Sequence, residues 1–89
     1  AFNNIVQRLH YSYYNAYIKV FSQSRVVMFF GDHPPPHVHI QLSDGRDCIV
    51  EIETRHVIGK ISFREIREAL NWIEIEQKFL NSEWQRCNS

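Results

Sequence analysis

The 89-residue sequence has little of the material that several classes of protein require. It contains two cysteines, Cys48 and Cys87, too few for the disulfide framework of a small secreted domain. No apolar run approaches the length of a membrane-spanning helix. The first residues are not a basic segment followed by an apolar one, as in a signal peptide. We therefore expect reduced thiols, a cytoplasmic protein and no membrane partner.

The chain also lacks an excess of charge of either sign. Lys and Arg together number 10, and so do Asp and Glu. This balance argues against a broad positive surface that grips nucleic acid, although a local basic patch is compatible with it. The apolar fraction of 44% is typical of a globular protein. At this length we expect one domain with a modest core.

Histidine and proline, by contrast, are concentrated in one stretch, residues 32–40 (DHPPPHVHI). Proline fixes its own φ, lacks an N–H and favours an extended residue before it. Residues 33–36 are therefore predicted to form a stiff, polyproline-like rod. Residues 37–42 (HVHIQL) alternate polar and apolar side chains, as a half-buried strand does. The rod should bring Asp32 and His33 to the start of that strand.

The strand that carries the histidines is expected to pair with one over residues 46–53. A two-residue turn between them would set Val38 against Glu51, whereas a three-residue loop with a left-handed glycine sets it against Val50. A slip of one residue exchanges the faces of a strand, so the register that keeps apolar residues together should win. The three-residue loop is therefore predicted, and it places His37 opposite Glu51.

Two further strands, over residues 17–21 and 25–30, are predicted to precede this hairpin. Apolar residues at helical spacing over residues 1–16 favour a short N-terminal helix, although the tyrosines there favour a strand. The sheet is thus expected to be small and antiparallel, with about four strands.

The last third of the chain carries the clearest helical pattern. Ser62 and Glu65 have the spacing of a capping box. Apolar residues then recur at spacings of three and four, interrupted only by Gln77, for which the sequence offers no explanation. One long C-terminal helix over residues 62–86 is expected to cover the apolar face of the sheet, which gives an α+β fold.

A second apolar group lies on roughly the opposite side of this predicted helix. Its members are Trp72, Ile75 and Phe79. Either the N-terminal segment covers them, or they form a surface for a protein partner or a homodimer.

Three interpretations of the histidine cluster are open. His37 and His39 could act as general acid and base on the two sides of a phosphodiester, oriented by Asp32 or Glu51. Alternatively, His37 and His39 could bind a divalent metal together with His33, Asp32 or Glu51. In the third interpretation the imidazoles only pack or cap backbone groups. No serine or cysteine nucleophile stands near them in sequence, which disfavours a covalent intermediate.

Residues 31–40 resemble the Asp-His-x-Pro-Pro-His-x-His signature of a small bacterial family, domain of unknown function 4160. The residues that match the signature are Asp32, His33, His37 and His39. The likeness continues through VEIE at 50–53, Gly59-Lys60, LNWI at 70–73, Leu80 and Trp84, so it covers about residues 18–86. Residues 1–17 are interpreted as an N-terminal extension, and residues 18–89 as the single domain.

The resemblance implies that the chain is the toxin of a bacterial type II toxin–antitoxin module. Its antitoxin would be a small protein of another uncharacterised family, number 2442. The resemblance does not specify the target; from the histidine cluster we expect action on RNA or translation, and any enzyme activity would be that of a ribonuclease-like or nucleotide-directed hydrolase. The alternatives are a non-catalytic module that sequesters a partner, or a small metal-binding protein.

Overall fold

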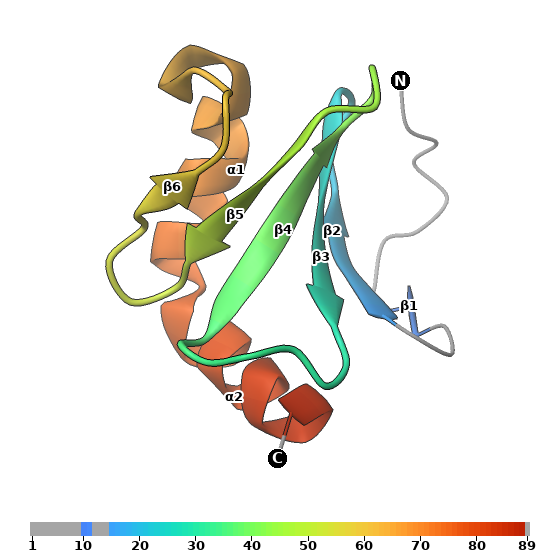
Figure 1. Cartoon of the computed structure of the whole chain (residues 1–89), viewed down its shortest axis with the longest axis vertical. Coiled ribbons are helices and arrows are strands. Elements are labelled where there is room, and N and C mark those ends of the chain that lie inside the picture. Colours follow the sequence, from blue (N-terminus) through green and yellow to red (C-terminus); the bar gives the residue numbers. More distant parts are fainter. Residues whose placement is uncertain (1–9, 12–14, 89) are drawn as a thin grey trace.

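The structure is a computed structural model that describes residues 10–11 and 15–88. One antiparallel sheet of six strands follows the chain order, so each strand pairs with its neighbours in sequence. Both helices follow the last strand and pack against one face of the sheet (Figure 1). The elements are β1 His10–Tyr11, β2 Asn15–Val20, β3 Ser24–Phe29, β4 His37–Leu42, β5 Asp47–Glu51, β6 Val57–Ile58, α1 Phe63–Ile75 and α2 Gln77–Asn88. This arrangement confirms the α+β class and the antiparallel sheet.

The hairpin of β4 and β5 has the predicted register. Val38 pairs with Val50 and His37 pairs with Glu51. Gly45 has a φ of +97°, which a glycine adopts at little cost, and it completes the three-residue loop. Val38 and Val50 are fully buried, whereas His39 points to the other face. The two faces of the hairpin therefore separate the core from the side chain of His39.

The core lies between the sheet and the two helices. Ile66, Ile73 and Leu80 project from the helices and are fully buried. They pack in one cluster with the inward side chains of the central strands, such as Val26 and Ile40. Apolar burial of this kind contributes roughly 1.5–3 kcal/mol per large side chain, so it is the main stabilising term here.

The sheet has more strands than expected, because two pairs of residues extend it at its edges. β1 lies within the predicted N-terminal helix over residues 1–16, and so does the start of β2. The prediction of a helix is therefore wrong for residues 10–11 and 15–16, and the rest of the predicted helix lies outside the described residues. β6 lies between the predicted strand over residues 46–53 and the predicted C-terminal helix, where no strand is predicted, and it pairs with β5. Both edge strands are only two residues long, too short for a periodic pattern in the sequence.

The predicted single C-terminal helix is also wrong, because the chain forms two helices that meet at Glu76. Glu76 has φ −102° and ψ 26°, outside the helical range. The next residue, Gln77, donates from Nε2 to the carbonyl oxygens of Ile52 at 2.6 Å and Glu53 at 3.2 Å. Gln77 therefore interrupts the apolar stripe of the helical region because its side chain donates to two backbone carbonyls just beyond β5. Neither helix, nor any other in the described part of the chain, is long and apolar enough to cross a membrane.

The first turn of α1 is fixed by the predicted capping box. The Ser62 N–H donates to Glu65 Oε2 at 3.0 Å. The Arg46 guanidinium, from the loop between β4 and β5, donates to Glu65 and pairs with Asp44 at 2.9 Å. The hydrogen bond from Arg46, followed by that from the Ser62 N–H, lowers the pKa of Glu65 to about 2. The ion pair links the helix start to the hairpin loop at the surface.

Replacing Gln77 with leucine should destabilise the fold. The variant keeps the volume but leaves the buried Ile52 carbonyl without its donor, so the free energy of unfolding should fall by about 1–3 kcal/mol. Urea denaturation measures this loss. The matched control is Gln85→Leu at an exposed position of α2, which should change stability by less than about 0.5 kcal/mol. Equal effects of the two changes would contradict a structural role for Gln77.

The ion pair of Glu65 predicts a specific acid sensitivity. The pKa of Glu65 is lower in the folded chain than its ordinary value of 4.5. Its stabilising effect is therefore present above pH 4.5 and is lost as the pH falls towards about 2. Gln at this position retains a capping oxygen but not the charge. Glu65→Gln should lose less stability than the wild type between these pH values, whereas Glu68→Gln, an exposed change one turn later, should follow the wild type. Thermal unfolding across this pH range tests the difference.

Candidate functional site

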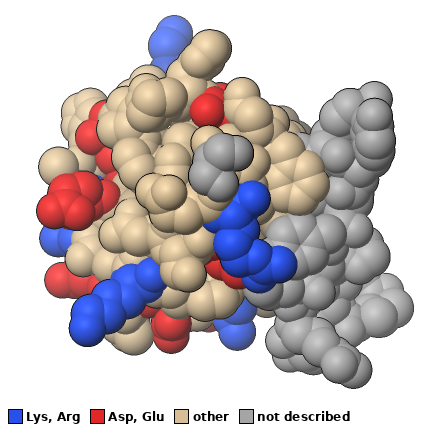
Figure 2. Space-filling view, turned by 90° about the horizontal axis from the view of Figure 1, so that it is seen from below, with Lys and Arg blue, Asp and Glu red and all other residues tan. Residues whose placement is uncertain are grey.

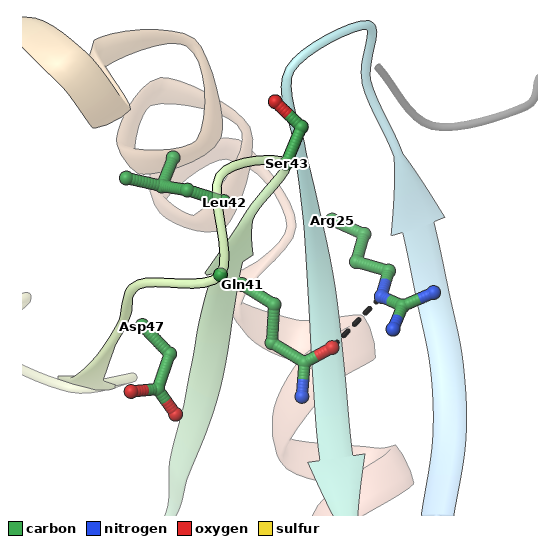
Figure 3. A pocket seen from close by; sticks show the side chains of 6 residues that line it. Arg25, Gln41, Leu42, Ser43 and Asp47 are labelled. Carbon is green, nitrogen blue, oxygen red and sulfur yellow. Dashed lines mark hydrogen bonds between the residues drawn. The ribbon is translucent and has the colours of Figure 1, made fainter.

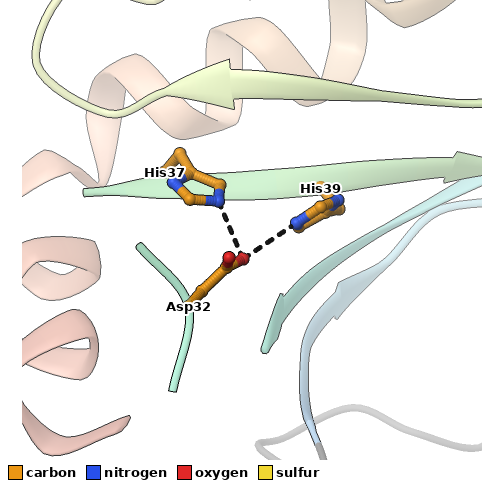
Figure 4. Close-up of side chains that lie close together, drawn as sticks. All are labelled: Asp32, His37 and His39. Carbon is orange, nitrogen blue, oxygen red and sulfur yellow. Dashed lines mark hydrogen bonds and ion pairs between the residues drawn. The ribbon is translucent and has the colours of Figure 1, made fainter. Parts of the chain in front are cut away.

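Three side chains from two segments meet at one end of the sheet. His37 and His39 project from the same face of β4, and Asp32 comes from the loop between β3 and β4 (Figure 4). Asp32 Oδ2 lies 2.8 Å from His37 Nε2 and 3.2 Å from His39 Nε2. Both imidazoles therefore point at the same carboxylate oxygen. We call these three residues the Asp-His-His cluster.

The proline segment brings Asp32 back over the strand. A straight polyproline rod would separate residues 32 and 37 by roughly 15 Å at 3.1 Å per residue. The expected rod is wrong, because the chain bends at Pro34 and Pro35, and the peptide bond between them is cis. The bend also presents the Pro35 carbonyl oxygen to His37 Nδ1, at 2.8 Å. Each nitrogen of the His37 ring thus has a partner from the loop.

The end of α2 holds the loop in this position. The Asp32 N–H donates to Asn88 Oδ1 at 2.6 Å, and the Gly31 N–H donates to the Cys87 carbonyl at 3.4 Å. The ring of Trp84 lies against the His37 ring, with centroids 5.1 Å apart. Sequence reasoning missed Asn88 altogether, and no spacing near residue 32 signals a partner 56 residues away. The last helix therefore supports the site as well as the core.

The hydrogen bonds of His37 require a positive charge between its ring and Asp32. A carbonyl oxygen only accepts, so the contact with Pro35 places a hydrogen on Nδ1. In a neutral ring this leaves a lone pair on Nε2, directed at a carboxylate oxygen 2.8 Å away. Two acceptors do not attract each other. A further proton or a cation must therefore lie between Nε2 and the carboxylate.

The carboxylate of Asp32 is the electrostatic centre of the cluster. Burial raises its pKa, but hydrogen bonds from His39, from the His33 N–H and from His37 outweigh this, so the pKa of Asp32 is lowered overall. The His33 N–H donates to Asp32 Oδ1 at 3.0 Å, while both imidazoles contact Oδ2. Asp32 is therefore ionised at neutral pH.

A cavity of about 280 Å³ opens beside the cluster. Asp32 and His37 line it, whereas His39 does not and packs against Phe29, with ring centroids 4.5 Å apart. The remaining walls are mostly apolar. The lining residues are Asp32, His33, Pro34, Pro35, His37, Ile49, Glu51 and Ile58.

Two of the predicted site residues line this cavity without joining the cluster. His33 is exposed, and only its backbone N–H is bonded to Asp32. Glu51 stands opposite His37 as predicted, but its carboxylate accepts from Thr54 Oγ1 at 3.0 Å. The structure thus brings together three of the five predicted residues and places the other two around the opening.

The second apolar group of the helical region is divided by the structure. Trp72 and Phe79 are partly buried against the core, and the Trp72 ring meets Phe21 edge-on with centroids 6.5 Å apart. Ile75 is 77% exposed at the end of α1. Ile75 is therefore the residue of this group that is most accessible to a partner.

A second cavity, of about 370 Å³, lies at the far end of β4 (Figure 3). Between two of its lining residues, Arg25 Nε donates to Gln41 Oε1 at 2.8 Å. The site has one carboxylate, Asp47, and none of the histidines. On the face drawn in Figure 2, basic and acidic side chains are intermixed rather than gathered by sign. The Asp-His-His cluster is therefore the stronger candidate for a chemical function.

The three side chains of the Asp-His-His cluster are also close enough together to bind one metal ion. One ligand atom from each of Asp32, His37 and His39 lies within 4.8 Å of the other two. Among the described residues, no other three His, Cys, Asp or Glu side chains bring their ligand atoms this close together. Such a cluster could hold a metal ion.

The fold and the cluster define a small α+β domain with a carboxylate and two imidazoles at the end of its sheet. A family model described as Domain of unknown function (DUF4160) matches residues 24–85. The chain therefore belongs to this family, and the match includes the whole cluster. No curated protein and no solved structure matches the chain.

His37 should matter more for stability than His39. His37 makes two side-chain hydrogen bonds and packs on Trp84, so His37→Ala should lower the free energy of unfolding by about 1–3 kcal/mol. His39 makes one such bond, and His39→Ala should cost about 1 kcal/mol less. Chemical denaturation of both variants, with the exposed His33→Ala as control, measures the order. The reverse order would show that the Pro35 contact is not stabilising.

Proposed function

We propose that this protein is the toxin of a bacterial type II toxin–antitoxin pair and that the Asp-His-His cluster acts on its target. The observation that carries the proposal is the meeting of two imidazoles at one half-buried carboxylate oxygen, beside a cavity. Membership of the DUF4160 family supports the toxin role through the resemblance of the signature. A cognate protein antitoxin would neutralise it.

The cluster is more elaborate than packing requires. The core is formed by the opposite face of β4, where Val38 and Ile40 are fully buried. The cluster needs a bent loop, a helix end and three polar side chains that lose solvent contact. Burying polar groups costs free energy unless they are paired, so such an arrangement is typical of a functional site.

We propose RNA as the substrate, because imidazoles exchange protons near neutral pH and phosphodiester cleavage needs such exchange. The 2′-hydroxyl oxygen would form a bond to phosphorus while the bond from phosphorus to the 5′ oxygen breaks. The cluster would accept the hydroxyl proton and return one to the leaving oxygen. Since both imidazoles converge on Asp32, the geometry favours a single reacting centre over two groups on opposite sides of the phosphodiester.

A second candidate function is a non-catalytic module that sequesters a partner. The observation in its favour is the apolar wall of the cavity, where Ile58 is 49% exposed on the edge strand β6. Exposed apolar side chains beside a recess are common at protein contacts. In that case the wild type would have no hydrolytic activity, and variants of the Asp-His-His cluster would lose binding to the partner.

Inducible expression in bacteria tests the proposed function. The wild type should arrest growth, and Asp32→Asn and His39→Gln should abolish the arrest, because each removes one cluster group at similar size. His56→Gln, an exposed histidine outside the cluster, is the matched control and should arrest growth like the wild type. Protein level and folding are checked for each variant. Equal arrest by wild type and cluster variants would contradict the role of the cluster, and no arrest by the wild type would contradict the toxin role.

A further inference from the structure

The distances from Asp32 to the two imidazoles are those of neighbouring ligands around one metal ion, and all three ligand atoms lie within 4.8 Å of one another. Zinc binds imidazole nitrogen and carboxylate oxygen at about 2.0–2.2 Å. Adjacent ligand atoms are then roughly 2.8–3.6 Å apart in octahedral or tetrahedral geometry. Asp32 Oδ2 lies 2.8 Å from His37 Nε2 and 3.2 Å from His39 Nε2. Small shifts would therefore admit an ion between the three atoms.

The Pro35 carbonyl supplies a second, independent observation. A histidine that binds a metal almost always donates its other ring N–H to a carbonyl or carboxylate, which fixes the tautomer. His37 Nδ1 meets the Pro35 oxygen at 2.8 Å, so in the neutral ring Nε2 carries the lone pair and faces Asp32. This is the orientation that a ligand nitrogen needs. The same lone pair makes the contact with Asp32 unfavourable unless a cation or proton lies between them.

The chemistry of the donors limits the metal. Two imidazoles and one carboxylate suit Zn²⁺ and related transition-metal ions, whereas Mg²⁺ and Ca²⁺ prefer oxygen ligands. Three protein ligands are also the number found in catalytic zinc sites, where a further position stays open. Asp32 and His37 line the cavity, so an ion held by them would be reached from it.

We infer that Asp32, His37 and His39 bind one divalent transition-metal ion, best fitted by Zn²⁺, whose open position is reached through the cavity beside Pro34 and Pro35. This inference deepens the proposed function, and it rests on that function for its use. An imidazole nitrogen that ligates the ion no longer accepts a proton, so with the ion bound the cluster would act on the substrate through the ion. The open position would take an oxygen of the RNA phosphodiester. The ligand set itself depends only on the three residues.

Direct metal binding tests the inference on the purified full chain without a histidine tag. After chelator treatment, titration with Zn²⁺ should show tight binding of one ion per chain. Co²⁺ in the same site should give the visible absorption of a four- or five-coordinate ion. His39→Gln should weaken Zn²⁺ binding by more than the roughly 10- to 100-fold that loss of an outer-shell partner costs. His33→Gln is the matched control, since His33 lines the same cavity outside the ligand set, and it should bind like the wild type.

Two results would overturn the inference: no stoichiometric Zn²⁺ binding by the folded wild type, or equal binding by the wild type and His39→Gln. Circular dichroism establishes folding in each case, and Asp32→Asn provides a second ligand variant of nearly unchanged size. Binding that needs all three residues in a protein that does not arrest growth would support the metal site and contradict the proposed function. Growth arrest by a protein that binds no metal would support the proposed function and contradict the metal site.

Discussion

The register of β4 against β5 is the constraint on which the rest of the structure depends. It directs Val38 and Ile40 into the core and His39 to the opposite face. A shift by one residue would bury the imidazoles among apolar side chains and expose the valine and isoleucine. The loss of apolar burial and the cost of burying polar rings act in the same direction. Core and site are thus specified by a single alternation of side chains.

The second requirement is closure of the loop before β4 onto the last helix. β4 supplies two imidazoles, but the carboxylate comes from a loop that the sheet does not fix. Asn88 at the end of α2 accepts from the Asp32 backbone, and Trp84 packs on His37. The core that anchors α2 therefore also determines where Asp32 lies. Packing far from the cluster should influence its geometry through this helix.

The features that the sequence predicts are those encoded by local patterns. Alternation over residues 37–42 and a glycine in the loop are enough to choose the hairpin register, and the capping box marks the start of α1. The errors arise from contacts between distant residues. Gln77 reads as a defect because its partners, the carbonyls of Ile52 and Glu53, are some 25 residues away. The bend at Pro34 and Pro35 is equally hidden, since each proline alone favours an extended chain.

The candidate site shows the same division. The sequence predicts that His37 and His39 share a face and that Asp32 is near, and the structure agrees. It does not predict that both rings point at one oxygen, because this depends on the direction in which the loop returns. That convergence changes the chemistry that the residues favour. Imidazoles on two sides of a substrate would transfer protons to and from different substrate atoms. Imidazoles that contact the same carboxylate oxygen can instead hold one proton or one metal ion between them and that oxygen.

The remaining question is which positive charge occupies that point. A proton satisfies the contact between His37 and Asp32, and the second lone pair of the same carboxylate oxygen can accept from His39 Nε2 at 3.2 Å. A metal ion satisfies all three groups at once, and the Pro35 carbonyl holds His37 in the tautomer that a metal requires. Without a metal, a proton would have to stand between the Nε2 lone pair of His37 and the Asp32 carboxylate. The two states therefore compete for one position, and the affinity for metal must exceed the cost of displacing that proton.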